Sequence, residues 1–176
     1  MRRRNLLTCL GGAALLTAAP LSLAGAATGT RTLSFFNTHT DEQVTARYRV
    51  DGVLDKGAKA DIDYILRDWR AGAVAEMDPN LLDLLVQVQN ATGVEGPLHI
   101  ISGYRTANTN SMLRKNGGGG VAKKSYHVRA QAIDVRLPGC KLKYLRKCAL
   151  DVAGGGVGYY PGPNFVHLDT GPVRRW

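Results

Sequence analysis

The sequence predicts an α+β fold with a small antiparallel sheet and helices packed on one side of it. Three observations support this prediction: helical apolar patterns gather early in the chain, short β-type runs gather late, and the sequence shows neither βαβ alternation nor an internal repeat. The length of 176 residues corresponds to about one domain, and a composition of 44% hydrophobic and 21% charged residues supports a folded core.

The first expected elements are a hairpin and two core helices. Residues 32–40 and 43–52 are β-type runs on either side of an acidic turn, which predicts two paired strands. Residues 55–69 carry large apolar side chains at helical spacing. A second helix is expected to begin at Asp78 and Pro79, because proline is favoured at the first helical position after an acidic cap.

The second half of the chain predicts short strands separated by loops. LHIIS at residues 98–102 is expected to be a strand, followed by the turn GYRT and a helix over residues 109–115. The four glycines at 117–120 predict either a mobile rim beside the site described next or a plain connector. Apolar and polar residues alternate over 132–137, and FVHLD at 165–169 is another β-type run, so both segments are expected to be strands.

Three residues in the segments SYHVRAQAID and NFVHLD, namely His127, Asp134 and His167, form a candidate metal site. Asp134 lies on the strand expected at 132–137, and His127 lies at the turn that leads into it. Two neighbouring strands could present Asp134 and His167 to one ion while the loop folds His127 over it. The alternative is three residues with ordinary hydrogen bonds, and the spacing alone leaves both interpretations open.

The chemistry of this trio favours a catalytic metal. Two neutral imidazoles and one carboxylate bind Zn²⁺ and leave a fourth position for water, which is the open arrangement of a catalytic zinc site. Such a water loses its proton near neutral pH and becomes a nucleophile, so a zinc site of this kind predicts a hydrolase. The other two histidines, His39 in a turn and His99 in a strand, are expected to have structural roles.

Residues 1–26 have the pattern of an export signal, with a basic start, an apolar stretch and a small-residue end. Arg3 and Arg4 fit the twin-arginine type, and cleavage is expected after Ala26. The alternative is an uncleaved membrane anchor, but Pro20 and two glycines interrupt an apolar run that is short for a span of about 20 residues. We therefore expect a periplasmic protein without stable membrane insertion after the signal is removed.

The charge of the chain indicates an anionic partner. Removing the three arginines of the signal changes 23 basic residues to 20 against 14 acidic ones, an excess of six. A basic excess attracts polyanions. Because an exported protein rarely meets nucleic acid, we expect a carboxylate-rich cell-wall polymer as the partner, no nucleic acid, and a monomeric protein.

Two cysteines remain after the signal, Cys140 and Cys148, at either end of a stretch with helical apolar spacing. A helix of this length would separate them by roughly 12 Å at about 1.5 Å per residue, so a disulfide would require Cys140 to lie off the helix start. We expect two free, buried thiols. Neither lies in a motif with an activating histidine, so a cysteine hydrolase is a poor alternative.

The run SGYRT, then SYHVRAQAID, then GVGYYPGPNFVHLDTGPVRRW resembles the exported murein endopeptidases of the zinc D-Ala-D-Ala metallopeptidase group, which is related to the hedgehog signalling domain. The matching blocks cover residues 100–176. The resemblance implies a single zinc peptidase domain at 27–176 that cuts peptide cross-links in peptidoglycan. It implies one zinc ion held by the trio of His127, Asp134 and His167. It also implies that Arg105 points at the reacting carbonyl, a role that a fixed guanidinium fits because negative charge builds on that oxygen.

The chain departs from the wider family at the general base. Related carboxypeptidases have a Glu three residues, or a His two residues, before the last ligand, where this chain has Asn164 and Phe165. Asp169 follows His167 by two residues on the same face of a strand, so it is a candidate for the base or for an outer partner of the ligand. A second departure is Ala130, where the pattern usually has glycine. The alternatives that remain open are a D,D- or L,D-carboxypeptidase of wall peptides and a metal- or wall-binding module without turnover.

Overall fold

The computed structural model describes residues 29–116 and 120–176. The predicted export signal at 1–26 and most of the four-glycine loop at 117–120 lie outside the described residues. Among the helices of the described part, none is both long enough and apolar enough to cross a membrane.

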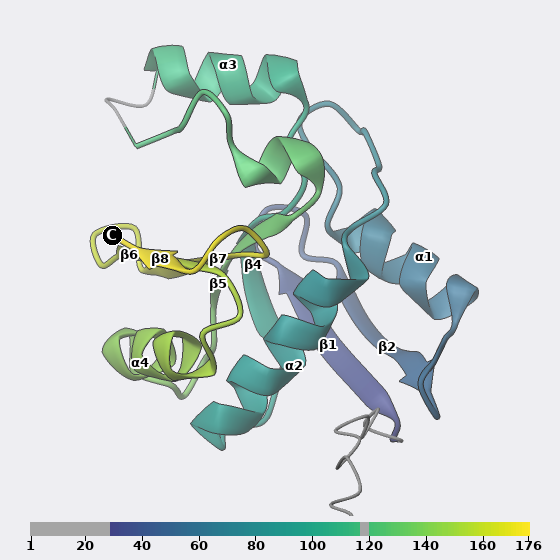
Figure 1. Ribbon diagram of the computed structural model, residues 1–176. Coiled ribbons are helices and arrows are strands. Elements are labelled where there is room, and N and C mark those ends of the chain that lie inside the picture. The colour runs from purple at the N-terminus through teal and green to yellow at the C-terminus, as the bar shows by residue number, and fades with distance from the viewer. Residues whose placement is uncertain (1–28, 117–119) are drawn as a thin grey trace, which may run out of the picture.

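One mixed sheet of eight strands dominates the described part of the chain, in the order β3-β2-β1-β4-β5-β7-β6-β8 (Figure 1). The strands are β1 (Arg31–Asn37), β2 (Gln43–Val50), β3 (Val53–Leu54), β4 (Leu98–Ser102), β5 (Ala132–Arg136), β6 (Gly156–Tyr160), β7 (Phe165–Asp169) and β8 (Arg174–Arg175). The predicted hairpin is present as β1 and β2. The pairs β1–β4 and β6–β8 are parallel, and the other neighbours are antiparallel.

The mixed α+β architecture is as predicted, but the expectation of a small antiparallel sheet is wrong. The chain between β1 and β4 contains two further strands and two helices, so β4 returns to the edge of β1 in the same direction. Parallel neighbours require such a long crossover connection, whereas a short hairpin gives antiparallel ones. The pairing of β4, β5, β7 and β6 is antiparallel throughout, so the local expectation holds only for the strands around the candidate site.

The described part of the chain contains four α-helices and one 3₁₀ turn. They are α1 (Lys56–Ile65), α2 (Pro79–Thr92), α3 (Ala107–Asn116), the 3₁₀ turn η1 (Tyr126–Arg129) and α4 (Leu142–Val152). Asp78 caps α2 by accepting a hydrogen bond from the backbone N–H of Asn80, with Pro79 in the first turn. Helix α1 ends earlier than predicted, because the carbonyl of Leu66 accepts a hydrogen bond from the Tyr104 N–H and Asp68 bonds the following turn.

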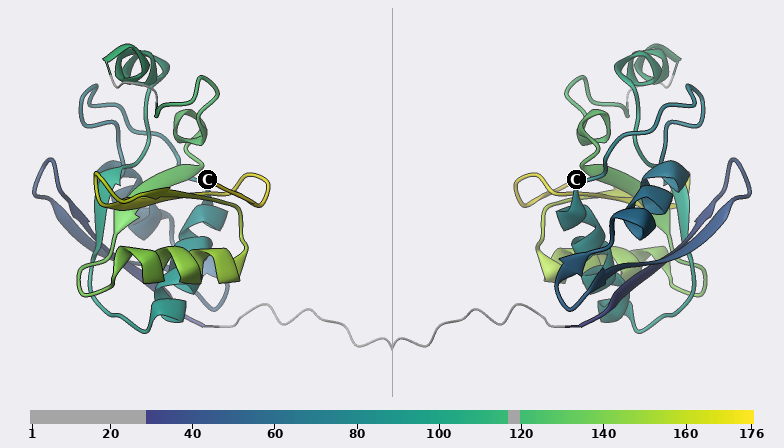
Figure 2. Two further views of the ribbon diagram at one scale, coloured as in Figure 1. Left: turned by 90° about the vertical axis from the view of Figure 1, so that its left-hand side faces the viewer. Right: turned by 90° about the vertical axis from the view of Figure 1, so that its right-hand side faces the viewer.

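The core lies on one face of the sheet. Ile133 and Val135 of β5 and Val166 and Leu168 of β7 belong to one buried cluster with the apolar faces of α1, α2 and α4. Figures 1 and 2 show these three helices packed around the sheet and α3 apart from them. Because side chains alternate along a strand, the residues between these apolar ones face the opposite side, where the candidate site is built.

Candidate metal centre

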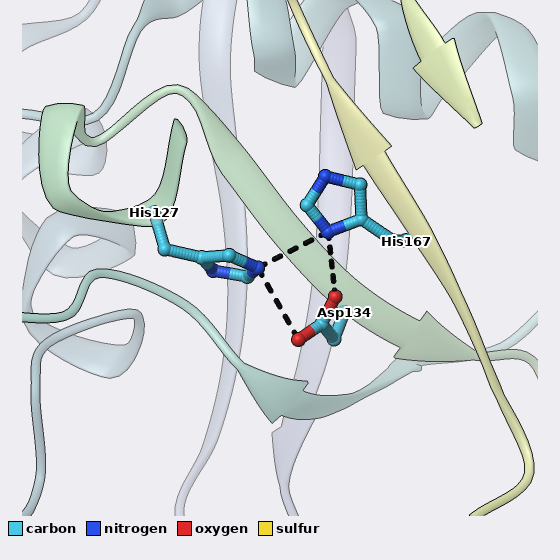
Figure 3. Close-up of side chains that lie close together, drawn as sticks. All are labelled: His127, Asp134 and His167. Carbon is cyan, nitrogen blue, oxygen red and sulfur yellow. Dashed lines mark hydrogen bonds and ion pairs between the residues drawn. The ribbon is translucent and has the colours of Figure 1, made fainter. Parts of the chain in front are cut away.

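The three predicted ligands come together where β5, β7 and η1 meet. Asp134 of β5 and His167 of β7 are direct partners in the register of the antiparallel pair. His127 lies on η1, which precedes β5, and Ala130 ends η1 in a left-handed conformation with φ 56°. This turn folds His127 back over the two strands, as Figure 3 shows. Glycine adopts this left-handed conformation most readily, which explains the glycine of the related pattern, and Ala130 adopts it in this chain.

The distances between the ligand atoms fit a metal ion. His127 Nε2 lies 3.2 Å from Asp134 Oδ2 and 3.1 Å from His167 Nδ1. His167 Nδ1 lies 2.8 Å from Asp134 Oδ1. Ligands of a tetrahedral zinc ion at about 2.0–2.1 Å from the metal lie about 3.3 Å from one another, close to these separations. All three side chains are buried, and His127 is fully inaccessible.

The hydrogen bonds behind the two rings determine where their protons lie. His127 Nδ1 is 2.7 Å from the carbonyl oxygen of Gly103, which can only accept, so Nδ1 donates. His167 Nε2 is 2.9 Å from Asp169 Oδ2 and donates to that carboxylate. In the neutral rings, His127 Nε2 and His167 Nδ1 then carry lone pairs that face each other and a carboxylate. Three convergent lone-pair donors repel one another unless a cation lies between them, so this donor set fits a metal ion.

The pKa shifts of the three residues affect metal binding in different directions. Burial lowers the pKa of His127 because it disfavours the imidazolium. Burial opposes ionisation of Asp134, but the facing rings of His127 and His167 outweigh it and hold its pKa below the ordinary range. His167 responds in the other direction: burial lowers its pKa, but hydrogen bonds to Asp134 and Asp169 outweigh burial and raise it. The His167 proton is thus the one that competes with a metal ion.

Asp169 lies behind His167, away from the metal position. Its carboxylate is fully buried and accepts hydrogen bonds from His167 Nε2, from both terminal nitrogens of Arg174 and from the backbone N–H groups of Gly156 and Gly171. Burial opposes its ionisation, but the His167 and Arg174 hydrogen bonds outweigh it and lower the Asp169 pKa. Asp169 is not among the residues that line the cleft in the described part of the chain.

Arg105 lies beside the ligands on the turn that follows β4. Its guanidinium is buried, and its terminal Nη2 lies 3.9 Å from Asp134 Oδ2. Its Nε has no hydrogen-bond partner among the described residues. The backbone N–H of Arg105 donates to the carbonyl of His127 at 3.2 Å, which ties the arginine to the ligand turn. A buried cation stabilises an anionic oxygen placed beside it more strongly than a solvated cation does.

A cleft of about 490 Å³ opens over the ligands. Three cationic side chains line it, Arg105, Lys124 and Arg174, and Asp134 is the one acidic residue among its described lining. An aromatic group lines the rest, and its members are Tyr126, Tyr160, Phe165 and Trp176. No pattern in the sequence predicted this aromatic group, although Tyr160 and Phe165 on either side of the turn between β6 and β7 were a signal that could have pointed to it.

The remaining residues weighed from the sequence lie outside the ligand cluster. His39 Nε2 lies 3.0 Å from the carbonyl oxygen of Ile101, and the ring stacks on Trp69. His99 lies on β4, and its ring packs against that of Phe36 on β1. Asn164 is exposed in the turn between β6 and β7 and does not line the cleft.

Ser125 lies at the start of η1, whereas the two cysteines lie outside the cleft. Ser125 caps η1 through the backbone N–H of His127, at 3.3 Å, so it orders the ligand turn. Cys140 and Cys148 are both free, as predicted. Cys148 is buried, whereas Cys140 is only partly buried, and neither lines the cleft.

Known proteins with similar sequences share one description. The model of a family described as "Peptidoglycan L,D-endopeptidase MepK" matches residues 25–176. A protein of Escherichia coli K12 with that name is 43% identical over 177 residues, which covers 99% of this chain and 96% of the relative. A Haemophilus influenzae protein named "Probable peptidoglycan L,D-endopeptidase MepK" is 40% identical over 147 residues, which covers 83% of this chain and 78% of the relative.

Proposed function

Because the chain belongs to the peptidoglycan L,D-endopeptidase MepK family, we propose that it is a zinc peptidase that hydrolyses peptide cross-links in peptidoglycan. The observation that carries this proposal is the convergence of three lone-pair donors beneath a cleft with a cationic and aromatic lining. The relatives' name specifies an L,D bond, and we propose the same bond type for this chain.

His127, Asp134 and His167 are the residues that would hold the zinc ion. Two neutral nitrogens and one carboxylate match the ligands of a catalytic zinc site and leave one position free. When bound, the ion would supply Lewis-acid chemistry at the peptide carbonyl and activate a water molecule. The carbonyl of Gly103 and the carboxylate of Asp169 keep the two rings in the tautomers that this role requires.

Arg105 would stabilise the negative charge that builds on the carbonyl oxygen during attack. Its guanidinium is held in place before substrate arrives, because the turn that carries it is bonded to Leu66, Asp68 and His127. A preorganised cation in a site that excludes water stabilises such a charge more strongly than a solvated one. Its nearest carboxylate, on Asp134, lies at 3.9 Å, so the donors of Arg105 remain available to an incoming oxygen.

Asp169 would act as the outer partner of His167 rather than as the general base. Both of its oxygens already accept hydrogen bonds, including one each from Arg174, and the side chain is inaccessible from the cleft. A base must reach the proton that it removes, within about 3 Å or through one water. No carboxylate other than Asp134 lines the described part of the cleft, so a Glu-type base is not part of this proposal.

The remaining parts of the proposal concern organisation and location. We place an export signal of the twin-arginine type at 1–26 and one peptidase domain at 27–176, acting as a monomer in the periplasm. The basic excess supports an anionic wall polymer as the substrate.

The test is muropeptide cleavage by the purified protein. Zinc-loaded protein is incubated with cross-linked muropeptides, and the products are identified by mass spectrometry, with the zinc content measured in parallel. We expect opened cross-links with the wild type and neither tight zinc binding nor cleavage with His127→Ala. His99→Ala is the matched control, because this histidine lies on β4 outside the cluster. Intact cleavage by His127→Ala would show that the proposed mechanism is wrong.

A further inference from the structure

We infer that Tyr160 is a substrate-binding residue whose phenol O–H, oriented by Trp176, donates a hydrogen bond to an acceptor oxygen of the wall peptide in the cleft. This inference rests on the proposed function for the identity of the substrate. Tyr160 and Trp176 are not among the proposed metal ligands, and neither forms a hydrogen bond with Arg105 in the described part of the chain.

The backbone holds both side chains at the rim of the cleft. Tyr160 ends β6 and pairs with Phe165 at the start of β7, and their rings stack with centroids 4.6 Å apart. Trp176 is held by two backbone hydrogen bonds to β6, from the Tyr159 N–H to its carbonyl and from its own N–H to the Val157 carbonyl. Tyr160, Phe165 and Trp176 all line the cleft.

Close packing fixes the place of the Trp176 ring. It lies over Gly158, where an added Cβ would approach the indole to 2.7 Å. The ring centroid is 5.3 Å from that of the proposed metal ligand His167, the register partner of Gly158. Trp176 therefore lies between Tyr160 and His167 in the lining of the cleft.

The direction of the hydrogen bond between the two residues sets the chemistry of Tyr160. Trp176 Nε1 lies 2.7 Å from the Tyr160 phenol oxygen. An indole N–H can only donate, so the phenol oxygen must accept. The phenol keeps its own proton, for which the described residues provide no acceptor. A hydroxyl that accepts one hydrogen bond becomes a better donor for the next, so Tyr160 is prepared to bind an oxygen that enters the cleft.

The alternative is that the pair only fastens the end of the chain to β6. In that case, loss of the hydroxyl changes stability but leaves substrate affinity unaffected. Tyr159 offers a matched control, because it neighbours Tyr160 on the same strand but packs against the hydrophobic core. Tyr159→Phe and Tyr160→Phe each remove one phenol oxygen, on opposite faces of β6.

The first experiment measures kcat and KM with cross-linked muropeptides. We expect Tyr160→Phe to lower kcat/KM by about three- to tenfold, the effect of one neutral hydrogen bond, with zinc content unchanged. Tyr159→Phe should stay within about twofold of the wild type. Trp176→Phe should lower kcat/KM by about threefold, and combining it with Tyr160→Phe should add nothing, because Trp176 acts through the Tyr160 hydroxyl. Wild-type kcat/KM in Tyr160→Phe, or additive losses in the double variant, would overturn the inference.

The second experiment does not depend on turnover, so it separates this inference from the proposed function. Trp69→Phe leaves Trp176 as the one tryptophan of the chain, and its fluorescence reports binding of a wall tripeptide with a free terminal carboxylate, and of the same peptide as an amide. We expect Tyr160→Phe in this background to weaken binding of at least the free acid by about three- to tenfold. A loss for the acid alone identifies the carboxylate as the acceptor, and equal losses identify an amide carbonyl. Unchanged affinity for both peptides refutes the inference, whether or not the protein cleaves muropeptides.

Discussion

Replacing Asp169 by asparagine separates the two roles that this residue could have. The carboxylate receives five hydrogen bonds, three at Oδ1 and two at Oδ2. An asparagine amide has one oxygen and one NH₂ group, so it can match only one of these two sets. The orientation that keeps the larger set places its oxygen at the Oδ1 position, where it still accepts from Gly156, Gly171 and Arg174. The NH₂ group then faces His167 Nε2 and Arg174 Nη2, the two donors that bond Oδ2.

This orientation changes the tautomer of His167. Two donors cannot share one hydrogen bond, so His167 Nε2 must give up its proton and accept from the new amide. The proton moves to Nδ1, where it bonds Asp134 Oδ1 at 2.8 Å and occupies the lone pair that the metal requires. Loss of an outer hydrogen-bond partner typically weakens metal affinity by about 10–100-fold, which corresponds to about 1.4–2.7 kcal/mol.

The assay is competition for Zn²⁺ between the protein and a chromophoric chelator, together with muropeptide cleavage at increasing zinc. We expect Asp169→Asn to bind zinc about 10–100-fold more weakly and to regain much of its activity at saturating zinc. Asp151→Asn is the matched control, because Asp151 is an exposed carboxylate paired with Lys147 on α4. Unchanged zinc affinity with a loss of kcat that zinc does not restore would contradict this role and identify Asp169 as the base.

Three further predictions concern the turn after β4 and Asp68, which accepts a hydrogen bond from this turn. Arg105→Ala should lower kcat by about 100-fold, with zinc content unchanged in metal analysis; a wild-type kcat would remove it from the mechanism. Gly103→Ala places a Cβ against the carbonyl of Leu66, so denaturant titration should show a loss of about 1–3 kcal/mol in unfolding free energy, and zinc affinity should fall with it. Burial opposes ionisation of Asp68, but hydrogen bonds from Thr109 and Thr106 outweigh it and lower its pKa. The stability that Asp68 contributes is present above its unfolded pKa of about 3.9 and is lost as pH falls through the lower folded pKa. Asp68→Asn should therefore reduce the loss of unfolding free energy at acid pH, and an unchanged pH profile of that free energy would contradict this.

The sequence alone was enough for features that depend on neighbouring residues. The cap and first proline of α2 follow from Asp78 and Pro79, and the strand around Asp134 follows from the alternation of side chains. Residue type made His127, Asp134 and His167 candidate ligands, but their spacing left ordinary hydrogen bonds open as an alternative until the family resemblance favoured a zinc site. Alternation also explains why His167 and Asp169 lie on one face of β7.

Features that depend on residues far apart in the chain became visible only in the three-dimensional structure. The sheet is large and mixed because β4 returns parallel to β1 after a long crossover, and no local pattern records that pairing. The proton positions on the two ligand rings depend on Gly103 and Asp169, and the donor role of Tyr160 depends on an indole 16 residues away. Residue type and local spacing determine what a group can bind, whereas long-range packing determines which of its lone pairs and protons remain free to do so.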